Sequence, residues 1–285
     1  MNLNTLLQYL SSCSGLLINM HNVTGILSCP PFDIERTFRK HTLKFCDIAK
    51  TTEKGFGLCT SCKKTVCKMA IKRGKAFFGV CPYGLLELVY PINLNEKTEC
   101  ILFLGNQTEN ISETAKKAEI TCKMTGVDFE KLSKEFANIK NADKSFMLKT
   151  ARIADEFIKL MYYKNRKNIT YSGHHSKITE DLCLYADEYF DRALTLKKMS
   201  ELYFMNEKYL GRLFLKQTGQ TFHSYVNMRR LDAAENLLKT TDRTVLDISA
   251  ECGFNSISYF NRIFRARYKK TPVQYRKLAQ TKTFY

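Results

Sequence analysis

Hydrophobic residues in the first 142 positions follow two different periods. Short apolar runs rich in β-branched and aromatic residues predict strands, and they lie at 15–20, 25–29, 76–81, 85–92 and 99–104. Segments with helical spacing of apolar residues lie at 34–49, 60–74, 112–125 and 128–139. Gly74 is a typical C-terminal stop for the second of these. Helices and strands interleave, so the sequence predicts one α+β domain over residues 1–142.

The pattern becomes purely helical from Asp143 onward. An amphipathic helix is predicted over 143–167, where a stripe is formed by Phe146, Ile153, Phe157 and Leu160. Three interpretations stay open for this helix: a connector, a dimer seam, or a helix packed on its own domain. The polar segment 168–176 lacks periodicity and is interpreted as a linker, with His174 and His175 as solvated residues. Residues 143–177 are therefore expected to connect the first domain to an all-α domain over 178–285.

A weak internal repeat occupies this all-α region, with an offset of 49 residues before the turn and 50 after it. One copy contains Leu196, Met199, Ser200, Asn206, Tyr209, Leu210, Arg212, Phe214 and Gly219. The other contains Val245, Ile248, Ser249, Asn255, Tyr259, Phe260, Arg262, Phe264 and Pro272. Each copy has the layout of a helix-turn-helix motif. A helix over 222–239 joins the copies and would hold two reading helices about one DNA turn, roughly 34 Å, apart.

The second helix of each copy has an apolar face and a polar face. The apolar residues are Leu210, Leu213 and Phe214 in one copy, and Phe260, Ile263 and Phe264 in the other. The DNA-contacting candidates on the polar faces are Lys208, Tyr209, Gly211, Arg212 and Lys216, then Ser256, Ser258, Tyr259, Asn261, Arg262 and Arg265. A major groove admits one α-helix, and arginine pairs bidentately with guanine. Asn206 and Asn255 would cap these helices or contact phosphate.

Composition agrees with an anionic partner but does not locate it. The chain has 285 residues and a formal net charge of +17, which favours nucleic acid. Residues 1–170 contribute +10 and residues 171–285 contribute +7, so a generally lysine-rich protein is the alternative on charge alone. No run of about 18 apolar residues predicts a membrane span. The N-terminus lacks a basic region typical of a secretory signal, so a cytoplasmic protein with 11 reduced cysteines is expected.

The C-terminal residues clearly resemble the AraC/XylS family of bacterial regulators. The resemblance is carried by Arg230-Leu231-Asp232-Ala233-Ala234, Cys252-Gly253-Phe254, Tyr259-Phe260-x-Arg262-x-Phe264-Arg265, Tyr268, and Thr271-Pro272-x-x-Tyr275-Arg276. It covers about residues 178–280 and implies seven helices, with two reading helices in adjacent major grooves. By position, the implied base-reading candidates are Lys208, Gly211 and Arg212, then Ser258, Tyr259 and Arg262. Phe204 departs from the pattern, because Gly253 stands at the matching turn position and glycine tolerates positive φ.

Five cysteines fall within residues 46–81, including a C-x-x-C pair at Cys59 and Cys62. Thiolates at that spacing can share a Zn²⁺ ion or an iron–sulfur cluster, with Cys46 and Cys81 completing a set of four. Cys67 would point about 140° away from Cys62 on one helix, which makes it a poor ligand. The alternatives are thiols that pack in the core or line a pocket, and a thiol redox sensor. We find no P-loop, G-x-S-x-G or H-E-x-x-H motif, so an enzyme is not expected.

The N-terminal half resembles the PocR-type sensory domain, an α+β fold related to PAS domains. The matching residues are Phe45-Cys46, Gly57-x-Cys59, Cys81-Pro82-Tyr83-Gly84-Leu85, Glu87, Pro91-Ile92 and Gly105-Asn106-Gln107. Pro82 departs from the family, which often has a Cys-His pair there, and this puts a histidine-dependent contact in doubt. The resemblance implies a sensor of a short, alcohol-like or other small metabolite. Its pocket candidates by position are Cys46, Cys59, Cys81, Tyr83, Leu85 and Glu87.

Together these features predict a one-component switch in which an effector bound by the first domain changes DNA binding by the second. The expected partners are double-stranded DNA, a small organic effector, RNA polymerase and a second copy of the chain. The rival hypotheses are a metal or redox sensor that uses Cys46, Cys59, Cys62 and Cys81, an enzyme with a DNA-binding tail, and a constitutive activator whose first half only dimerises.

Overall fold

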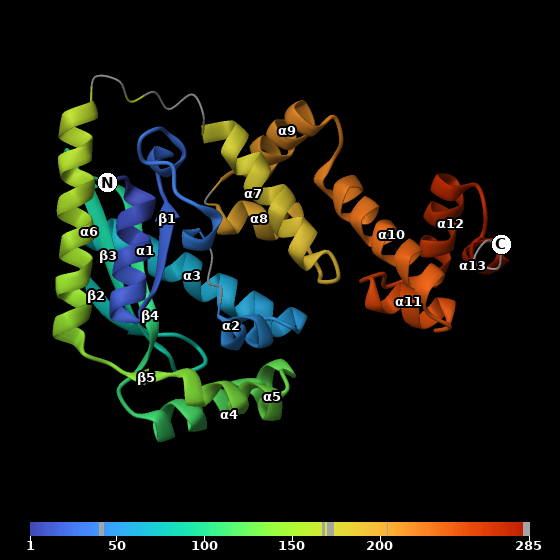
Figure 1. The fold of residues 1–285 in the computed structure, drawn as a ribbon, viewed down its shortest axis with the longest axis horizontal. Helices are drawn as coiled ribbons and strands as arrows, with labels where there is room; N and C mark the ends of the chain where they lie inside the picture. Colours follow the sequence, from blue (N-terminus) through green and yellow to red (C-terminus); the bar gives the residue numbers. More distant parts are fainter. Residues whose placement is uncertain (40–42, 167–168, 170–173, 204, 282–285) are drawn as a thin grey trace. The chain divides into compact units, whose positions relative to one another are not determined.

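The computed structural model describes residues 1–285 except 40–42, 167–168, 170–173, 204 and 282–285. The chain divides into two compact units (Figure 1). Unit 1 comprises residues 1–178 and 201–205, and unit 2 comprises residues 179–200 and 206–285. Each unit is described by itself below.

A five-stranded sheet forms the centre of unit 1. Strands β1 (Leu17–Asn22), β4 (Lys97–Thr108), β3 (Leu86–Leu94) and β2 (Phe77–Val80) are antiparallel in that spatial order, and β5 (Lys140–Asn141) pairs with β4 in parallel. A two-residue turn at Asn95 and Glu96, with φ of 48° and 64°, joins β3 to β4. Positive φ at both positions matches the twist of a hairpin. The sheet with its helices confirms the predicted α+β class, while a relation to PAS domains stays a prediction.

Helices cover both faces of this sheet, which explains why β4 is apolar along its middle rather than alternating. One face carries Leu102 and Leu104 and packs against α1 (Leu3–Ser14) and α6 (Lys144–Asn165). The other face carries Ile101 and Phe103 and packs against α3 (Glu53–Arg73). Figure 1 shows α1 and α6 side by side on one side of the strands. The loop between β2 and β3 packs with α2 (Lys44–Ala49), α4 (Ile111–Thr125) and α5 (Phe129–Ser133), which is followed by η3 (Lys134–Asn138).

Two of the predicted elements in unit 1 are wrong. The strand expected at 25–29 is a 3₁₀ turn, η1 (Ile26–Ser28), because Gly25 has a φ of 109° and the Asn22 side chain accepts hydrogen bonds from the backbone N–H groups of Gly25 and Leu27. The single helix expected over 34–49 is instead η2 (Arg36–Phe38) and α2, with residues 40–42 between them outside the described part.

Helix α1 was not predicted from the sequence, and the other remaining helices of unit 1 differ from expectation mainly at their ends. Helix α3 begins at Glu53 rather than near Thr60, because Thr52 caps it and accepts a hydrogen bond from the Gly55 N–H. Glycine has a low helix propensity, so the two glycines in its first turns, at 55 and 57, kept this start from being predicted. Helix α6 packs on its own unit through Met147, Ala151, Ala154 and Ile158.

Unit 2 is all-helical, as predicted. Its helices are α7 (His174–Tyr189), α8 (Leu196–Leu202), α9 (Glu207–Thr218), α10 (Phe222–Thr240), α11 (Val245–Glu251), α12 (Ile257–Tyr268) and α13 (Pro272–Thr281). The core of its second half is formed by Leu231, Ala234 and Leu238 of α10 with Phe260 and Phe264 of α12. The predicted linker over 168–176 lies mostly outside the described residues, and α7 already begins at His174.

Candidate DNA-binding surface and ligand pocket

Helices α8 and α9 form the first helix-turn-helix motif. Leu210 and Phe214, one turn apart on α9, are fully buried and fix this helix to the unit. Asn206 is the N-cap, and its side-chain oxygen accepts a hydrogen bond from the Tyr209 N–H at 3.2 Å. The capping role expected of Asn206 is therefore observed. The turn residue Phe204 lies outside the described residues.

The outer face of α9 presents most of the predicted DNA-contacting side chains to solvent. These are Lys208, Tyr209, Arg212 and Lys216. Gly211 differs, because a Cβ atom there would lie 2.9 Å from Leu196 Cδ2 of α8. Gly211 therefore lets α9 approach α8 closely, and its direction toward α8 argues against the expected base contact.

Helices α11 and α12 form the second motif, in which Phe260 and Phe264 take the places of Leu210 and Phe214. The N-cap of α12 is Ser256, which accepts a hydrogen bond from the Tyr259 N–H at 3.3 Å. The capping role predicted for Asn255 is thus wrong, since the extra residue in this turn moves the helix start by one position. The exposed side chains on and before α12 are Asn255, Ser256, Ser258, Asn261, Arg262 and Arg265.

Tyr259 is only half exposed, and its hydroxyl is already engaged. It accepts a hydrogen bond from Asn227 Nδ2 of α10 at 2.9 Å. The guanidinium of Arg262 lies over the Tyr259 ring at 5.2 Å from the centroid. Tyr259 therefore ties α12 to α10 and supports the Arg262 side chain from one side.

The turn of the second motif requires its glycine for two reasons. Gly253 has a φ of 82°, in the left-handed region. A Cβ atom at this position would also lie 2.4 Å from the Asp191 carbonyl oxygen, in the loop after α7. Arg230 of α10 holds that loop by donating hydrogen bonds to the carbonyl oxygens of Phe190 at 2.6 Å and Arg192 at 2.8 Å.

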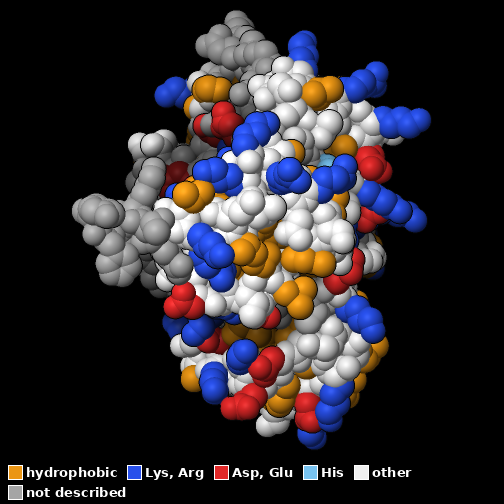
Figure 2. Space-filling model, turned by 90° about the vertical axis from the view of Figure 1, so that its right-hand side faces the viewer, with side chains coloured by type: hydrophobic (Ala, Val, Ile, Leu, Met, Phe, Trp, Pro, Cys, Tyr) orange, Lys and Arg blue, Asp and Glu red, His pale blue; other side chains and the backbone are white. Residues whose placement is uncertain are grey.

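The C-terminal end of unit 2 is strongly positive. Residues 252–285 contain eight lysine or arginine residues and no acidic residue. Figure 2 shows Lys and Arg side chains spread over the face that it presents, with hydrophobic and acidic side chains between them. A surface of this composition attracts phosphate groups, and phosphate contacts supply most of the sequence-independent affinity for DNA.

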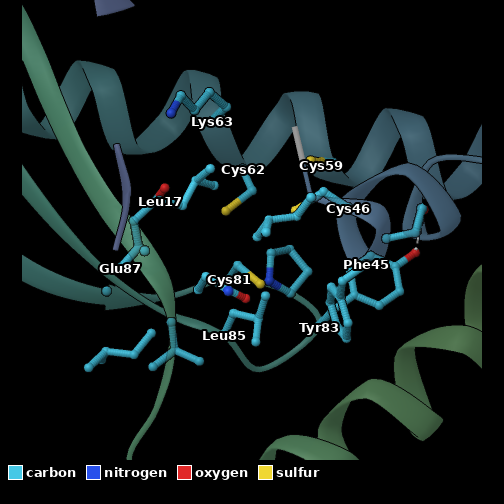
Figure 3. Close-up of a pocket in the computed structure, with 18 of the residues that line it drawn as sticks. Leu17, Phe45, Cys46, Cys59, Cys62, Lys63, Cys81, Tyr83, Leu85 and Glu87 are labelled. Atoms are coloured by element: carbon cyan, nitrogen blue, oxygen red, sulfur yellow. Dashed lines mark hydrogen bonds between the residues drawn. The ribbon is translucent and has the colours of Figure 1, made fainter. Parts of the chain in front are cut away.

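Unit 1 contains a pocket between α3 and the face of the sheet that α3 covers. Its empty space is about 870 Å³, part of which is open to solvent. All six residues predicted from the family resemblance line it, namely Cys46, Cys59, Cys81, Tyr83, Leu85 and Glu87. The prediction missed Lys63 of α3, Leu17 of β1, and Gly79 and Gly105 of the sheet, which also line it. Figure 3 shows the labelled cysteines in the middle of this pocket, with α3 on one side.

The space exists because glycines flank one side chain on the sheet. Gly79 of β2 pairs with Glu87 of β3, and Gly105 of β4 lies on the other side, where a Cβ atom would be 3.5 Å from Glu87 Cγ. A Cβ atom on Gly79 would meet nothing within 4 Å. The next row on the same face, Phe77, Val89 and Phe103, is filled by large side chains. The missing side chains therefore leave a hollow around the Glu87 carboxyl group.

The turn that ends the pocket is fixed by hydrogen bonds. The Cys81 N–H donates to the Leu85 carbonyl at 2.8 Å, and Gly84 N–H donates to the Cys81 carbonyl at 2.9 Å. The Tyr83 hydroxyl donates to the Ala49 carbonyl of α2 at 3.0 Å. The sequence signal for this turn was the Pro82-Tyr83-Gly84 segment before a buried strand.

Three of the cysteines that line the pocket lie in a poorly solvated environment. Burial raises the pKa of Cys46 to about 12 and also raises the pKa of Cys62 and of Cys81. Within the described residues, no three His, Cys, Asp or Glu side chains converge in an arrangement that would hold a metal ion. Cys67 is buried in the core between α3 and the sheet and does not line the pocket.

Comparisons with known proteins identify both halves of the chain. A family model described as the sensory domain found in PocR matches residues 6–164. A helix-turn-helix domain model matches residues 199–278. Regulatory protein SoxS of Escherichia coli (strain K12) is 36% identical over 102 residues, which cover 36% of this chain and 95% of SoxS.

Two solved structures are similar to the C-terminal part. The C-terminal domain of the two-component response regulator yesN from Fusobacterium nucleatum is 32% identical, with a TM-score of 0.33, covering 34% of this chain and 95% of that one. The DNA-binding domain of AdpA, solved in complex with a target DNA, is 22% identical, with a TM-score of 0.35, covering 36% of this chain and 94% of that one. Among the helices of the described residues, none combines the length and hydrophobicity needed to cross a bilayer.

Proposed function

Because this chain belongs to the AraC-type family of DNA-binding transcriptional regulators and its N-terminal domain is of the PocR sensory type, we propose that a small organic effector in the unit 1 pocket controls its binding to DNA. The observation that carries this proposal is the pocket itself, which gathers all six residues implied by the sensory-domain resemblance. An effector would change DNA affinity by the coupling energy between the two sites, typically about 1–3 kcal/mol.

In this proposal, the residues that contact DNA are chosen by the exposure of their side chains to solvent. Arg212 of α9 and Arg262 of α12 are exposed on the faces opposite the buried aromatic and aliphatic residues, and each is a candidate for a guanine contact. Lys208, Lys216 and Arg265 would contact bases or phosphates beside them. RNA polymerase would be the further partner through which the bound regulator acts on transcription.

The alternative of a metal or redox sensor has one supporting observation, namely that Cys46, Cys59, Cys62 and Cys81 all line one pocket. Two others weigh against it. Metal ligation and thiol oxidation both start from the thiolate, and burial favours the thiol at Cys46, Cys62 and Cys81. Within the described residues, the side chains that could coordinate a metal ion also do not converge on one position. We therefore propose an organic effector.

Filling the pocket should abolish the response to the effector. Gly79→Leu places a side chain into open space on the pocket wall, whereas Gly57→Leu places one into open space outside the lining residues. Small organic molecules that raise the thermal midpoint of the full chain would be selected first. They should alter its affinity for a duplex enriched from a random pool, as measured by fluorescence anisotropy.

The expected result is that these molecules act on the wild-type chain and on Gly57→Leu but not on Gly79→Leu. A set of molecules that still binds Gly79→Leu, or that binds the wild type without changing DNA affinity, would contradict the proposal.

A further inference from the structure

A hydrogen-bonded group of three side chains lies where α10 and α12 of unit 2 meet, beside the exposed face of α12. His223 and Asn227 are one turn apart on α10, so they point to the same side of that helix. Asn227 is buried, whereas His223 is exposed. Tyr259 of α12 contacts Asn227, and its ring centroid is 6.5 Å from that of His223. The group therefore extends from the core to the solvent.

The Tyr259 side chain is held in place on several sides. Its ring lies near the buried ring of Phe254, with the centroids 6.4 Å apart, and the Arg262 guanidinium lies over it. Its hydroxyl oxygen is bound by Asn227. A side chain that is already ordered loses little conformational freedom when a ligand binds, and this favours affinity.

The direction of the hydrogen bond from Asn227 determines what the Tyr259 hydroxyl group can offer to a ligand. Asn227 Nδ2 donates to it at 2.9 Å and also lies 3.3 Å from Nδ1 of His223. A tyrosine hydroxyl group both accepts and donates. Because the oxygen of Tyr259 accepts from Asn227, its own proton is left to donate. Within the described part of the chain, that proton makes no hydrogen bond to a protein acceptor.

The position of this proton favours a phosphate group over a base as its acceptor. Ser258 and Arg262 are exposed on the outer face of α12, whereas the Tyr259 hydroxyl group lies back against α10. When a helix lies in a major groove, the base edges face its outer side and the sugar-phosphate strands run along its flanks. Tyrosine is among the side chains that donate hydrogen bonds to phosphate oxygens.

We propose that the Tyr259 hydroxyl group donates a hydrogen bond to a DNA phosphate oxygen, and that Asn227 positions it for this contact. This inference rests on the proposed function, because it assigns roles within the same DNA-binding surface. It replaces the base contact that the family resemblance implied for Tyr259. A phosphate contact at this point fixes the register of α12 in the groove, so that Arg262 meets a defined base. Asn227 is a positioning residue, since it acts through Tyr259.

Removal of one oxygen atom tests the phosphate contact. Tyr259→Phe keeps the ring beneath Arg262 and should weaken binding to a duplex enriched by the wild-type chain from a random pool by about tenfold, since a charged acceptor is lost. Fluorescence anisotropy should show the same loss on duplexes with single base-pair substitutions. The slope of log Kd against log salt concentration should stay at the wild-type value, because a neutral donor releases no counter-ions.

Tyr268→Phe is the matched control on the same helix. The Tyr268 hydroxyl group also links α12 to α10, but it already donates within the protein, to the Leu231 carbonyl at 3.4 Å and to Glu235 Oε2 at 3.3 Å. Tyr268→Phe should therefore bind DNA like the wild type. Equal losses in the two variants would overturn the proposal, and so would wild-type affinity of Tyr259→Phe or a loss confined to one base pair.

Asn227→Leu tests the positioning role. Leucine has a similar shape but no donor, so the Tyr259 hydroxyl group is no longer held, and DNA binding should weaken by about threefold. Tyr259→Phe should then cost less in the Asn227→Leu background than in the wild type. Additive losses would show that Asn227 does not act through Tyr259. Tyr259→Phe, at a half-exposed position, decides the phosphate contact even where Asn227→Leu fails to fold.

Failure of this inference can be told from failure of the proposed function. If the wild-type chain enriches a duplex and an effector changes that affinity, while Tyr259→Phe binds the duplex fully, the proposed function stands and the phosphate contact alone is wrong. If the wild-type chain enriches no duplex, both are wrong.

Discussion

Lys269 ends α12 in the left-handed region, with a φ of 59°. Gly219 ends α9 in the same way fifty residues earlier, with a φ of 73°. A side chain in this region costs about 1 kcal/mol relative to glycine. Lys269→Gly should therefore raise the free energy of unfolding by about 0.5–1 kcal/mol. The matched change Gly219→Ala meets no neighbour within 4 Å and should lower it by a similar amount. Urea unfolding followed by circular dichroism measures both, and a loss of stability in Lys269→Gly or a gain in Gly219→Ala would refute the argument.

Arg262 is exposed beside Tyr259, so its guanidinium is free to approach a base edge. Arg262→Ala should cost about 1–3 kcal/mol of DNA binding at one base position, measured by anisotropy on duplexes with single substitutions. Arg212→Ala should act on a different position of the same site. A uniform loss on every duplex would show that Arg262 contacts phosphate.

At the residue scale, the sequence predicted well wherever a local rule determines the outcome. Gly253 was expected at a positive φ and has one, and the six pocket residues were found by family position. The sequence did not predict contacts between residues that are far apart along the chain. The Gly211 contact with Leu196 and the Asn227 bond to Tyr259 depend on how helices pack, and no local pattern encodes them.

Helix α6 has apolar residues on two faces, and only one of them is used within unit 1. Phe146, Ile153 and Leu160 are exposed and repeat every seven residues. This spacing is typical of paired helices, so the partner we propose for this face is α6 of a second copy. The sequence had left open whether this helix packs on its own domain, and the structure shows that its other face does so.

The oligomeric state tests this partner directly. Ile153→Glu places a charge in the middle of the stripe and should convert a dimer to a monomer in light scattering after size exclusion. Leu246→Glu changes a leucine in unit 2 that is at least as exposed as Ile153, and it should leave the mass unchanged. A wild-type monomer at the same concentration would contradict the expectation.

The stability of the whole molecule should depend on pH through His21. Burial, with a smaller effect of Lys63, lowers the pKa of His21 to about 3. Between that value and the ordinary pKa near 6.5, the unfolded chain binds a proton that the folded chain does not, so the folded state loses stability as pH falls. From pH 7 to pH 5 the loss is about 2 kcal/mol. His21→Leu should reduce this pH dependence when urea unfolding is compared at the two values, and an unchanged dependence would exclude His21 as the cause.

The two glycines that flank Glu87 on the sheet, Gly79 and Gly105, have a practical consequence. They offer a place at which the ligand preference of the regulator could be altered. At Gly79 the cavity wall is main chain alone, with open space beyond it. A graded series of alanine, serine and valine at this one position would shorten the cavity stepwise, while the hydrophobic cores and the helices proposed to contact DNA keep their residues. The size of effector that the protein accepts could then be adjusted without changing the DNA sequence that it binds. This independence is required of a regulator that is to be engineered as a biosensor.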